Sequence, residues 1–243
     1  MASTDWALLS GALASGDCKR GVTVGIAPPD GGGSFVYGMN SIENVAGVVA
    51  LNVTLANFAP MLKGGRVTGA LKRGVGGAPT GFAPFLFIGL DGSAVSSSGY
   101  ILGLADEDPC HIVLRKGALV DGLPDDAPDP DTAPNILMRS TDTFAIDSWH
   151  HLRLDMIVQG TGDVILQVFR SDLNLHAVGS PVWAAVPGME GPFAPAIEGF
   201  VDDALGVNTG SVPFTSGRVG FGSRFESAGR RAFMDHVTVD RQL

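Results

Sequence analysis

Apolar and polar residues alternate most clearly between Ser148 and Phe169, in the segment SWHHLRLDMIVQGTGDVILQVF. From His150 onward the pattern has a period of two, which is typical of a strand with one buried face. The apolar side consists of Leu152, Leu154, Met156 and Val158, and the polar side of His151, Arg153 and Asp155. A second alternating run follows the glycine-rich turn at residues 159–163. The segment therefore predicts an antiparallel hairpin with one apolar and one polar face.

Short runs of the same kind recur along most of the chain, separated by glycines and prolines that indicate frequent turns. We expect strands at residues 22–26, 35–39, 47–55, 66–73, 82–90, 100–104, 112–114, 135–139, 217–222 and 232–240. The run at 47–55 is expected in the middle of a sheet and the run at 82–90, apolar on both sides, within the sandwich. The charged run at 66–73 is expected at the edge of a sheet. In the last run Phe233, Val237 and Val239 should share a face with Asp235.

A long connection, Ser171 to Ser216, follows the hairpin and carries scattered aromatic residues among prolines and glycines. Within it Ile197, Val201 and Leu205 are spaced at i, i+4 and i+8, which predicts a short helix at residues 196–205. We expect residues 1–243 to form a single β-sandwich domain, with residues 171–216 as a loop insertion near the C-terminus.

Composition and charge argue against two classes of function, membrane insertion and nucleic-acid binding. No apolar run approaches the ~20 residues that a membrane span needs, so we expect no membrane insertion. The net charge of −9 argues against nucleic acid as a partner, because that binding depends on lysine and arginine. The local basic cluster, Lys63, Arg66, Lys72 and Arg73, is interpreted as solvated positions around an edge strand. The N-terminus lacks a basic region followed by an apolar run, so we expect synthesis in a host cytosol without a signal peptide.

The order of the strand motifs resembles the concanavalin A-like lectin/glucanase superfamily, including laminin-G-like modules. The motifs are GYILGL at 99–104, IVLR at 112–115, WHHLRL at 149–154 with its hairpin, and GRVGF at 217–221 with FMDHVTV at 233–239. The resemblance implies an all-β, two-sheet antiparallel jelly-roll sandwich. Hydrolases of that superfamily carry E-x-D-x-E on one strand, and no two glutamates here have that spacing. We therefore expect no enzymatic activity and assign no catalytic residue.

Two groups of polar residues are candidates for chemistry. Adjacent His150 and His151 point to opposite faces of a strand, so they cannot bind one metal together; we place His150 at the core margin and His151 on the surface. The acidic loops are interpreted as solvated turns, with calcium as the alternative because it prefers carboxylate and carbonyl oxygens. The calcium candidates are Asp106, Asp108, Asp202 and Asp203.

The aromatic residues of the long connection are the candidates for ligand or partner contact. Trp183 is either a platform for stacking a sugar or an anchor for its own loop. Met189, Phe193 and Phe200 are interpreted as a patch that packs on this domain or on a neighbouring subunit.

A lectin-like sandwich resembles modules found on the capsids, tails and fibres of tailed bacteriophages, whose virion proteins are made in the host cytosol without a secretion signal and work outside it. We predict a non-enzymatic structural or decoration protein of a phage capsid or tail, in contact with other virion proteins or with copies of itself, and with host-surface polysaccharide as a further ligand. The alternatives are a free carbohydrate-binding, lectin-like protein and a glycoside hydrolase.

Overall fold

The computed structural model describes residues 6–10, 18–21, 36–40, 47–53, 64–73, 82–94, 96–105, 108–119, 136–171, 181–191, 198–225 and 231–241. These ranges contain fifteen strands and no α-helix. The helix predicted at 196–205 is wrong over its described part, because Phe200–Asp202 form a strand followed by turns. In the described part of the chain no helix has the length and apolarity to cross a membrane. The strand predicted at 22–26 lies outside these ranges.

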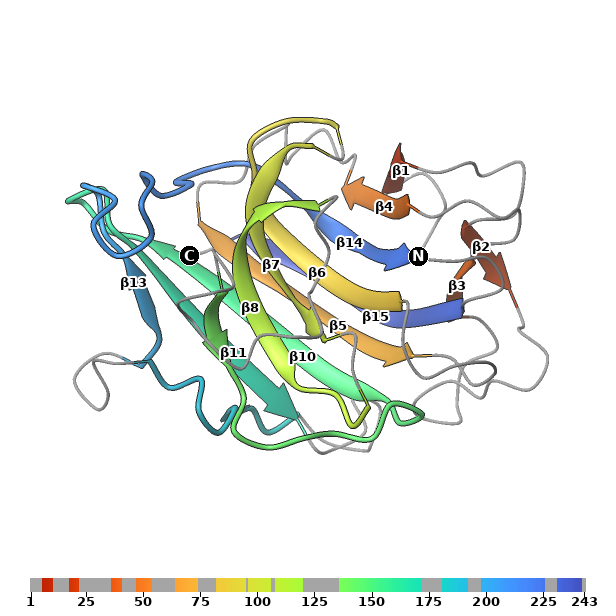
Figure 1. Ribbon diagram of the computed structural model, residues 1–243. Helices are drawn as coiled ribbons and strands as arrows, with labels where there is room; N and C mark the ends of the chain where they lie inside the picture. The colour runs from red at the N-terminus through yellow and green to blue at the C-terminus, as the bar shows by residue number, and fades with distance from the viewer. Residues whose placement is uncertain are drawn as a thin grey trace.

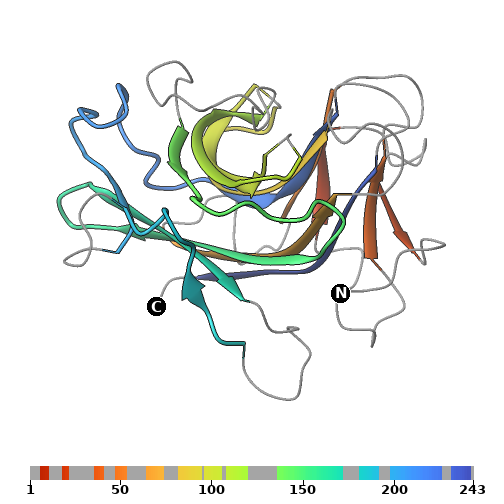
Figure 2. The ribbon, with the colours of Figure 1, turned by 60° about the horizontal axis from the view of Figure 1, so that its bottom comes forward.

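The strands form two sheets in which all recorded pairings between neighbours are antiparallel (Figures 1 and 2). The seven-stranded sheet has the order β1 (Trp6–Ser10), β4 (Gly47–Val53), β14 (Arg218–Phe225), β6 (Phe82–Leu90), β7 (Ser98–Leu104), β8 (Ile112–Ala118) and β9 (Ile136–Arg139). The eight-stranded sheet has the order β12 (Ala184–Ala185), β11 (Val164–Ser171), β10 (His150–Val158), β5 (Gly65–Arg73), β15 (Arg231–Arg241), β3 (Val36–Asn40) and β2 (Cys18–Gly21). Its eighth strand, β13 (Phe200–Asp202), pairs with β11 beside β12. The predicted all-β, two-sheet antiparallel jelly-roll sandwich is confirmed.

The hairpin predicted from the alternating pattern is strands β10 and β11. They pair from His151 opposite Ser171 to Val158 opposite Val164, without a break in register. The turn closes through the amide of Gln159, which donates to the Asp163 carbonyl at 2.8 Å, and Gly162 has a φ of +94°. That backbone conformation favours glycine, so the turn explains why this position has no side chain.

The main core lies between the sheets, and apolar residues of both inner faces fill it. It includes Leu86, Ile88, Tyr100 and Leu102 from one sheet and Val67, Leu71, Leu152 and Leu154 from the other. Intervening residues of β6, β7 and β8 form a second buried cluster that includes Phe85, Phe87, Ile101 and Val113. Because neighbouring residues on a strand point to opposite faces, this cluster lies on the outer face of the seven-stranded sheet. Figure 2 shows these three strands curving strongly.

Strand β5 lies in the interior of its sheet, and the predicted edge position is therefore wrong. It pairs with β10 on one side and β15 on the other. Arg73 is fully buried at its end, where Nη1 donates to the carbonyl of Ala105 at 3.0 Å. Lys63 lies outside the described residues. Arg66 and Arg73 of β5 thus have partners within the fold and do not mark a free edge.

Strand β15 contains a bulge that the alternating pattern does not reveal. The register with β5 shifts between Asp235 and Thr238, and His236 has a φ of +49°. Ala232 and Met234 before the bulge, and Val237 after it, belong to the main core, while buried Phe233 lies outside that cluster. The prediction that Phe233 shares a face with Val237 is therefore wrong, because one inserted residue reverses the alternation.

Candidate functional site

The outer face of the eight-stranded sheet differs between its two ends. Toward one end Ala70, His151, Ser171 and Phe233 are buried on it, and His151 is only 5% exposed. The prediction that His151 lies on the surface is therefore wrong. His150 is buried as predicted at the margin of the core, where its ring packs against Phe144 and its Nε2 lies 2.8 Å from the carbonyl oxygen of Ala145. The other end of the same face carries a groove with charged walls.

The groove has a volume of about 310 Å³, and its floor crosses three adjacent strands. Its lining residues are Arg66 and Thr68 of β5, Arg153 of β10, Thr238, Asp240 and His236 of β15, and Pro181 and Trp183. The pairing register places Arg153, Thr68 and Thr238 in one row across the sheet, and Asp155, Arg66 and Asp240 in the next row. With Phe169 opposite Arg153 on β11, the first row spans four strands, or about 14 Å at the ~4.8 Å spacing of strands.

Asp155 holds the two arginines of the groove in fixed positions. Its Oδ1 accepts hydrogen bonds from Nε of both Arg66 and Arg153, each at 2.8 Å, and its Oδ2 accepts from Nη2 of both. Burial raises the pKa of Asp155, but the hydrogen bonds from Arg153 and Arg66 outweigh it and hold the pKa below its usual value. One carboxylate thus binds two guanidinium groups, so Arg66, Arg153 and Asp155 together carry one net positive charge.

Trp183 reaches the groove because the segment 181–191 packs along the edge of the sheet. Ala184 and Ala185 pair with Arg170 and Phe169 of β11. Further along, Gly191 lies against Gly199, where an added Cβ would come within 1.7 Å of a backbone oxygen. The Arg153 guanidinium lies 4.5 Å from the ring centre of Phe169 and 5.9 Å from that of Trp183. The guanidinium of Arg153 therefore lies over the rings of both Phe169 and Trp183 at this end of the groove.

The bulge of β15 forms the opposite wall. The His236 side chain is partly exposed, and its Nε2 lies 3.2 Å from Oδ2 of Asp235. Asp235 also accepts a hydrogen bond from the His236 amide at 2.8 Å, and this bond stabilises the unusual backbone conformation. Strained backbone of this kind is concentrated at functional sites. Here the bulge places the imidazole of His236 in the groove wall, whereas a regular strand would point that side chain in another direction.

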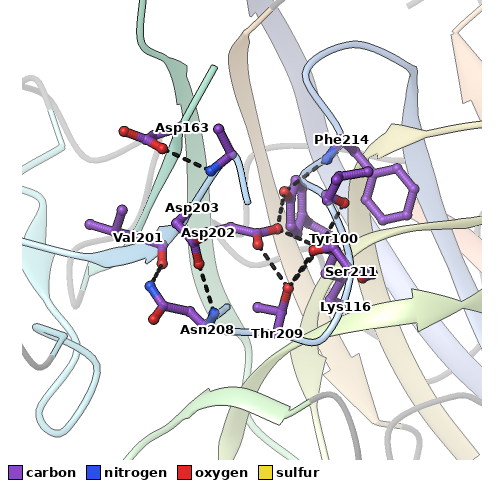
Figure 3. A network of polar contacts seen from close by, with 12 residues as sticks. Tyr100, Lys116, Asp163, Val201, Asp202, Asp203, Asn208, Thr209, Ser211 and Phe214 are labelled. Atoms are coloured by element: carbon purple, nitrogen blue, oxygen red, sulfur yellow. Dashed lines mark hydrogen bonds and ion pairs between the residues drawn. The ribbon is translucent and has the colours of Figure 1, made fainter. Parts of the chain in front are cut away.

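A second polar cluster, centred on Asp202, is buried at one end of the sandwich (Figure 3). Tyr100 donates to Asp202 Oδ2 at 2.6 Å, and Lys116 Nζ lies 2.7 Å from the same oxygen. Lys116 also donates to Thr209 Oγ1 and to the carbonyls of Ser211 and Val212 at 2.7–2.9 Å. Burial and the hydrogen bond to Asp202 raise the pKa of Tyr100 strongly. These side chains are buried and mutually satisfied, so the cluster fastens the 203–214 loop to β7 and β8 and leaves no face for a substrate.

The two calcium candidates of this region have other partners. Both oxygens of Asp202 are occupied, Oδ1 by the Thr209 hydroxyl at 2.8 Å. Asp203 accepts from the amides of Leu205, Val207 and Asn208, and these hydrogen bonds lower its pKa. Among the described residues no three His, Cys, Asp or Glu side chains gather as metal ligands would. Asp108 is exposed and Asp106 lies outside the described residues.

Of the four predicted contact residues, Trp183 lies at the groove. Met189 is 1% exposed and belongs to the main core, and Phe200 packs against that core, so both pack on their own domain. Phe193 lies outside the described residues. Arg66, Arg153 and Asp155 were not predicted as site residues. Their signal was charge on the polar side of two strands, but only the pairing of β5 with β10 brings those charges together.

No protein-family model and no curated protein matches this sequence. Among solved structures, an alginate lyase from Aplysia kurodai is similar with a TM-score of 0.51 at 10% identity, over 93% of this chain and 87% of that chain. The carbohydrate-binding module CBM66 from Bacillus subtilis gives 0.47 at 11% identity, over 97% and 95% of the two chains. The Emp46p carbohydrate recognition domain gives 0.48 at 12%, over 99% and 89%. The likeness to the lyase is one of fold, a two-sheet jelly-roll sandwich.

Proposed function

We propose that this protein is a non-enzymatic carbohydrate-binding protein that holds a polysaccharide in the groove of its eight-stranded sheet. The observation that carries the proposal is the half-buried ring of Trp183 beside the guanidinium of Arg153. Sugars present apolar C–H faces to aromatic rings and hydroxyl groups to polar donors. The groove offers both kinds of contact, since Trp183 and the row of Arg153, Thr68 and Thr238 all line it.

The groups in the groove favour binding over hydrolysis. Glycosidases use two carboxyl groups, one as acid and one as nucleophile or base. Here Asp155 is occupied by two arginines, and Asp240 is the remaining carboxylate among the lining residues described above. A carboxylate bound by two guanidinium groups is a poor proton donor, because its pKa is lowered. This supports the expectation that the protein is not an enzyme.

The test is a glycan array followed by titration calorimetry, with alginate in the panel because it is the substrate named for the Aplysia enzyme. W183A should weaken binding of the best saccharide about tenfold or more, since it removes the stacking surface. V182A is the matched control, because Val182 is the neighbouring residue and is 67% exposed. Binding that W183A leaves unchanged would contradict the site. Release of shorter or unsaturated sugars would contradict the non-enzymatic role.

A place in a bacteriophage virion is the finer form of this proposal. One structural observation favours a protein partner: Leu205, Val207 and Val212 are 86%, 78% and 66% exposed on the loop that Lys116 fastens. Apolar side chains on a firmly held loop suit contact with another virion protein or another copy. Sedimentation velocity and analysis of purified virions test it. A chain that is monomeric at high concentration and absent from any virion would refute this form and leave carbohydrate binding untouched.

A further inference from the structure

We infer that the groove selects acidic polysaccharides by binding a sugar carboxylate on Arg66 and Arg153. The inference rests on the proposed function, since it names the class of saccharide for the same groove. Asp155 holds both arginines in fixed positions at this groove.

Both guanidinium groups have donors left over. Each uses Nε and Nη2 for Asp155. Nη1 of Arg66 and of Arg153 makes no hydrogen bond to any group in the described part of the chain, and both residues line the groove. A guanidinium group that binds a carboxylate on one edge still presents its remaining N–H groups to another acceptor. The groove therefore contains two oriented, charged donors without acceptors among the residues that the structure describes.

The arginine pair also lacks a second carboxylate bound to it by hydrogen bonds among the described residues. Asp155 is 6% exposed and neutralises only one of the two arginines. Asp240 stands on the rim beside Arg66 and makes the pKa of that arginine higher, but no hydrogen bond or ion pair joins the two among the described residues. The side-chain contacts of Asp235 within the described part of the chain are with His236. A ligand carboxylate would supply the second partner that the arginine pair lacks.

The geometry favours a carboxylate attached to a sugar ring. Guanidinium groups bind planar carboxylates through paired N–H donors. Trp183 lies on the far side of Arg153 from Arg66, so a saccharide that contacts both the indole and Arg66 must cross the guanidinium of Arg153. The threonine hydroxyls of the same row, Thr68 and Thr238, could then bind ring hydroxyls. A uronic acid combines these three groups in one unit.

The experiment compares polygalacturonate with its fully methyl-esterified form, which has the same backbone without the charge. We expect polygalacturonate oligomers to bind about tenfold or more tightly than their esters, with an affinity that falls as salt is added. R66Q should remove most of that preference, because its affinity for the acid should fall much more than its affinity for the ester. Arg66 has a side chain that is 40% exposed, so the variant should fold. R153Q is the second variant, with folding checked by thermal denaturation.

K72Q is the matched control. It removes the same charge from the same face of β5, about 20 Å from Arg66 at ~3.3 Å per residue. Equal affinity for acid and ester, stronger binding of a sulfated galactan, or equal losses in R66Q and K72Q would overturn the carboxylate assignment. In each of those cases the proposed function survives if a saccharide still binds in a Trp183-dependent way. Binding of no saccharide at all refutes both.

Discussion

Replacing Lys116 with methionine tests whether the buried cluster holds the 203–214 loop in place. The side chains of Lys116 and Asp202 are 4% and 0% exposed, so the ion pair is shielded from water. K116M would leave Asp202 with the hydroxyls of Tyr100 and Thr209 as its partners, and the carbonyls of Ser211 and Val212 without their donor. Removing one member of a buried pair costs about 3–5 kcal/mol.

The opposite substitution should cost less, and the structure gives the reason. In D202N the ammonium group of Lys116 keeps three oxygen acceptors, and the amide can still accept from Tyr100. We expect a loss of about 1–3 kcal/mol for D202N. The double variant K116M/D202N removes both charges, so it should be more stable than the sum of the single losses by at least about 1 kcal/mol.

The assay is urea denaturation followed by circular dichroism, with the four proteins of the cycle measured together. Hydrogen exchange at the amide of Phe214, which donates to Tyr100 Oη at 3.0 Å, reports on the loop itself. Because a domain is typically stable by only ~5–15 kcal/mol, a loss of the expected size is large and easily measured. A K116M protein within about 1 kcal/mol of wild type, or strictly additive losses, would refute the reasoning.

Two further predictions concern the groove and the segment that carries Trp183. Since the pKa of Asp155 is held below its unfolded value of 3.8, its ion pairs stabilise the fold above that pH, and this stability is lost as the pH falls through the folded-state pKa. D155N should therefore lower the urea midpoint at neutral pH and flatten its acid dependence; an unchanged acid profile would contradict this. G191A should destabilise the fold by more than G210A, although both glycines have positive φ. A Cβ on Gly191 would strike Gly199, while one on Gly210 meets nothing within 4 Å. G210A should cost about 1–2 kcal/mol from its backbone alone, and equal thermal shifts would contradict the close approach.

Local patterns predicted much of the sandwich. Alternation with period two placed the β10–β11 hairpin and its apolar face, because residues that point toward a core repeat at every second position of a strand. The apolar run at 82–90 became buried strand β6 in the interior of its sheet, and the run at 47–55 became β4, which pairs on both sides. The predicted helix was wrong because spacings of four residues also occur by chance in a loop that a strand interrupts.

Such local patterns predicted less of the candidate site. Arg66 and Asp155 are 89 residues apart, and their contact depends on β5 lying beside β10. The burial of His151 likewise depends on what covers one end of the outer sheet face. The bulge at His236 changes which residues face the core, and no composition rule marks its position. Each of these features is a relation between segments, so a reading of single segments could not supply it.

For this protein, the amino-acid sequence by itself determined the class of fold and the polar face of the hairpin, because the period of an extended chain is a local property. It also singled out Trp183 as a residue with two roles open to it. Tertiary structure alone decided that Arg66, Arg153 and Asp155 share one face with that tryptophan, and that Asp202 and Lys116 are a buried pair. The physical reason is the same in both cases. Strand pairing and burial bring together charges that are distant in the chain, and the strength of an electrostatic interaction depends on that distance and burial.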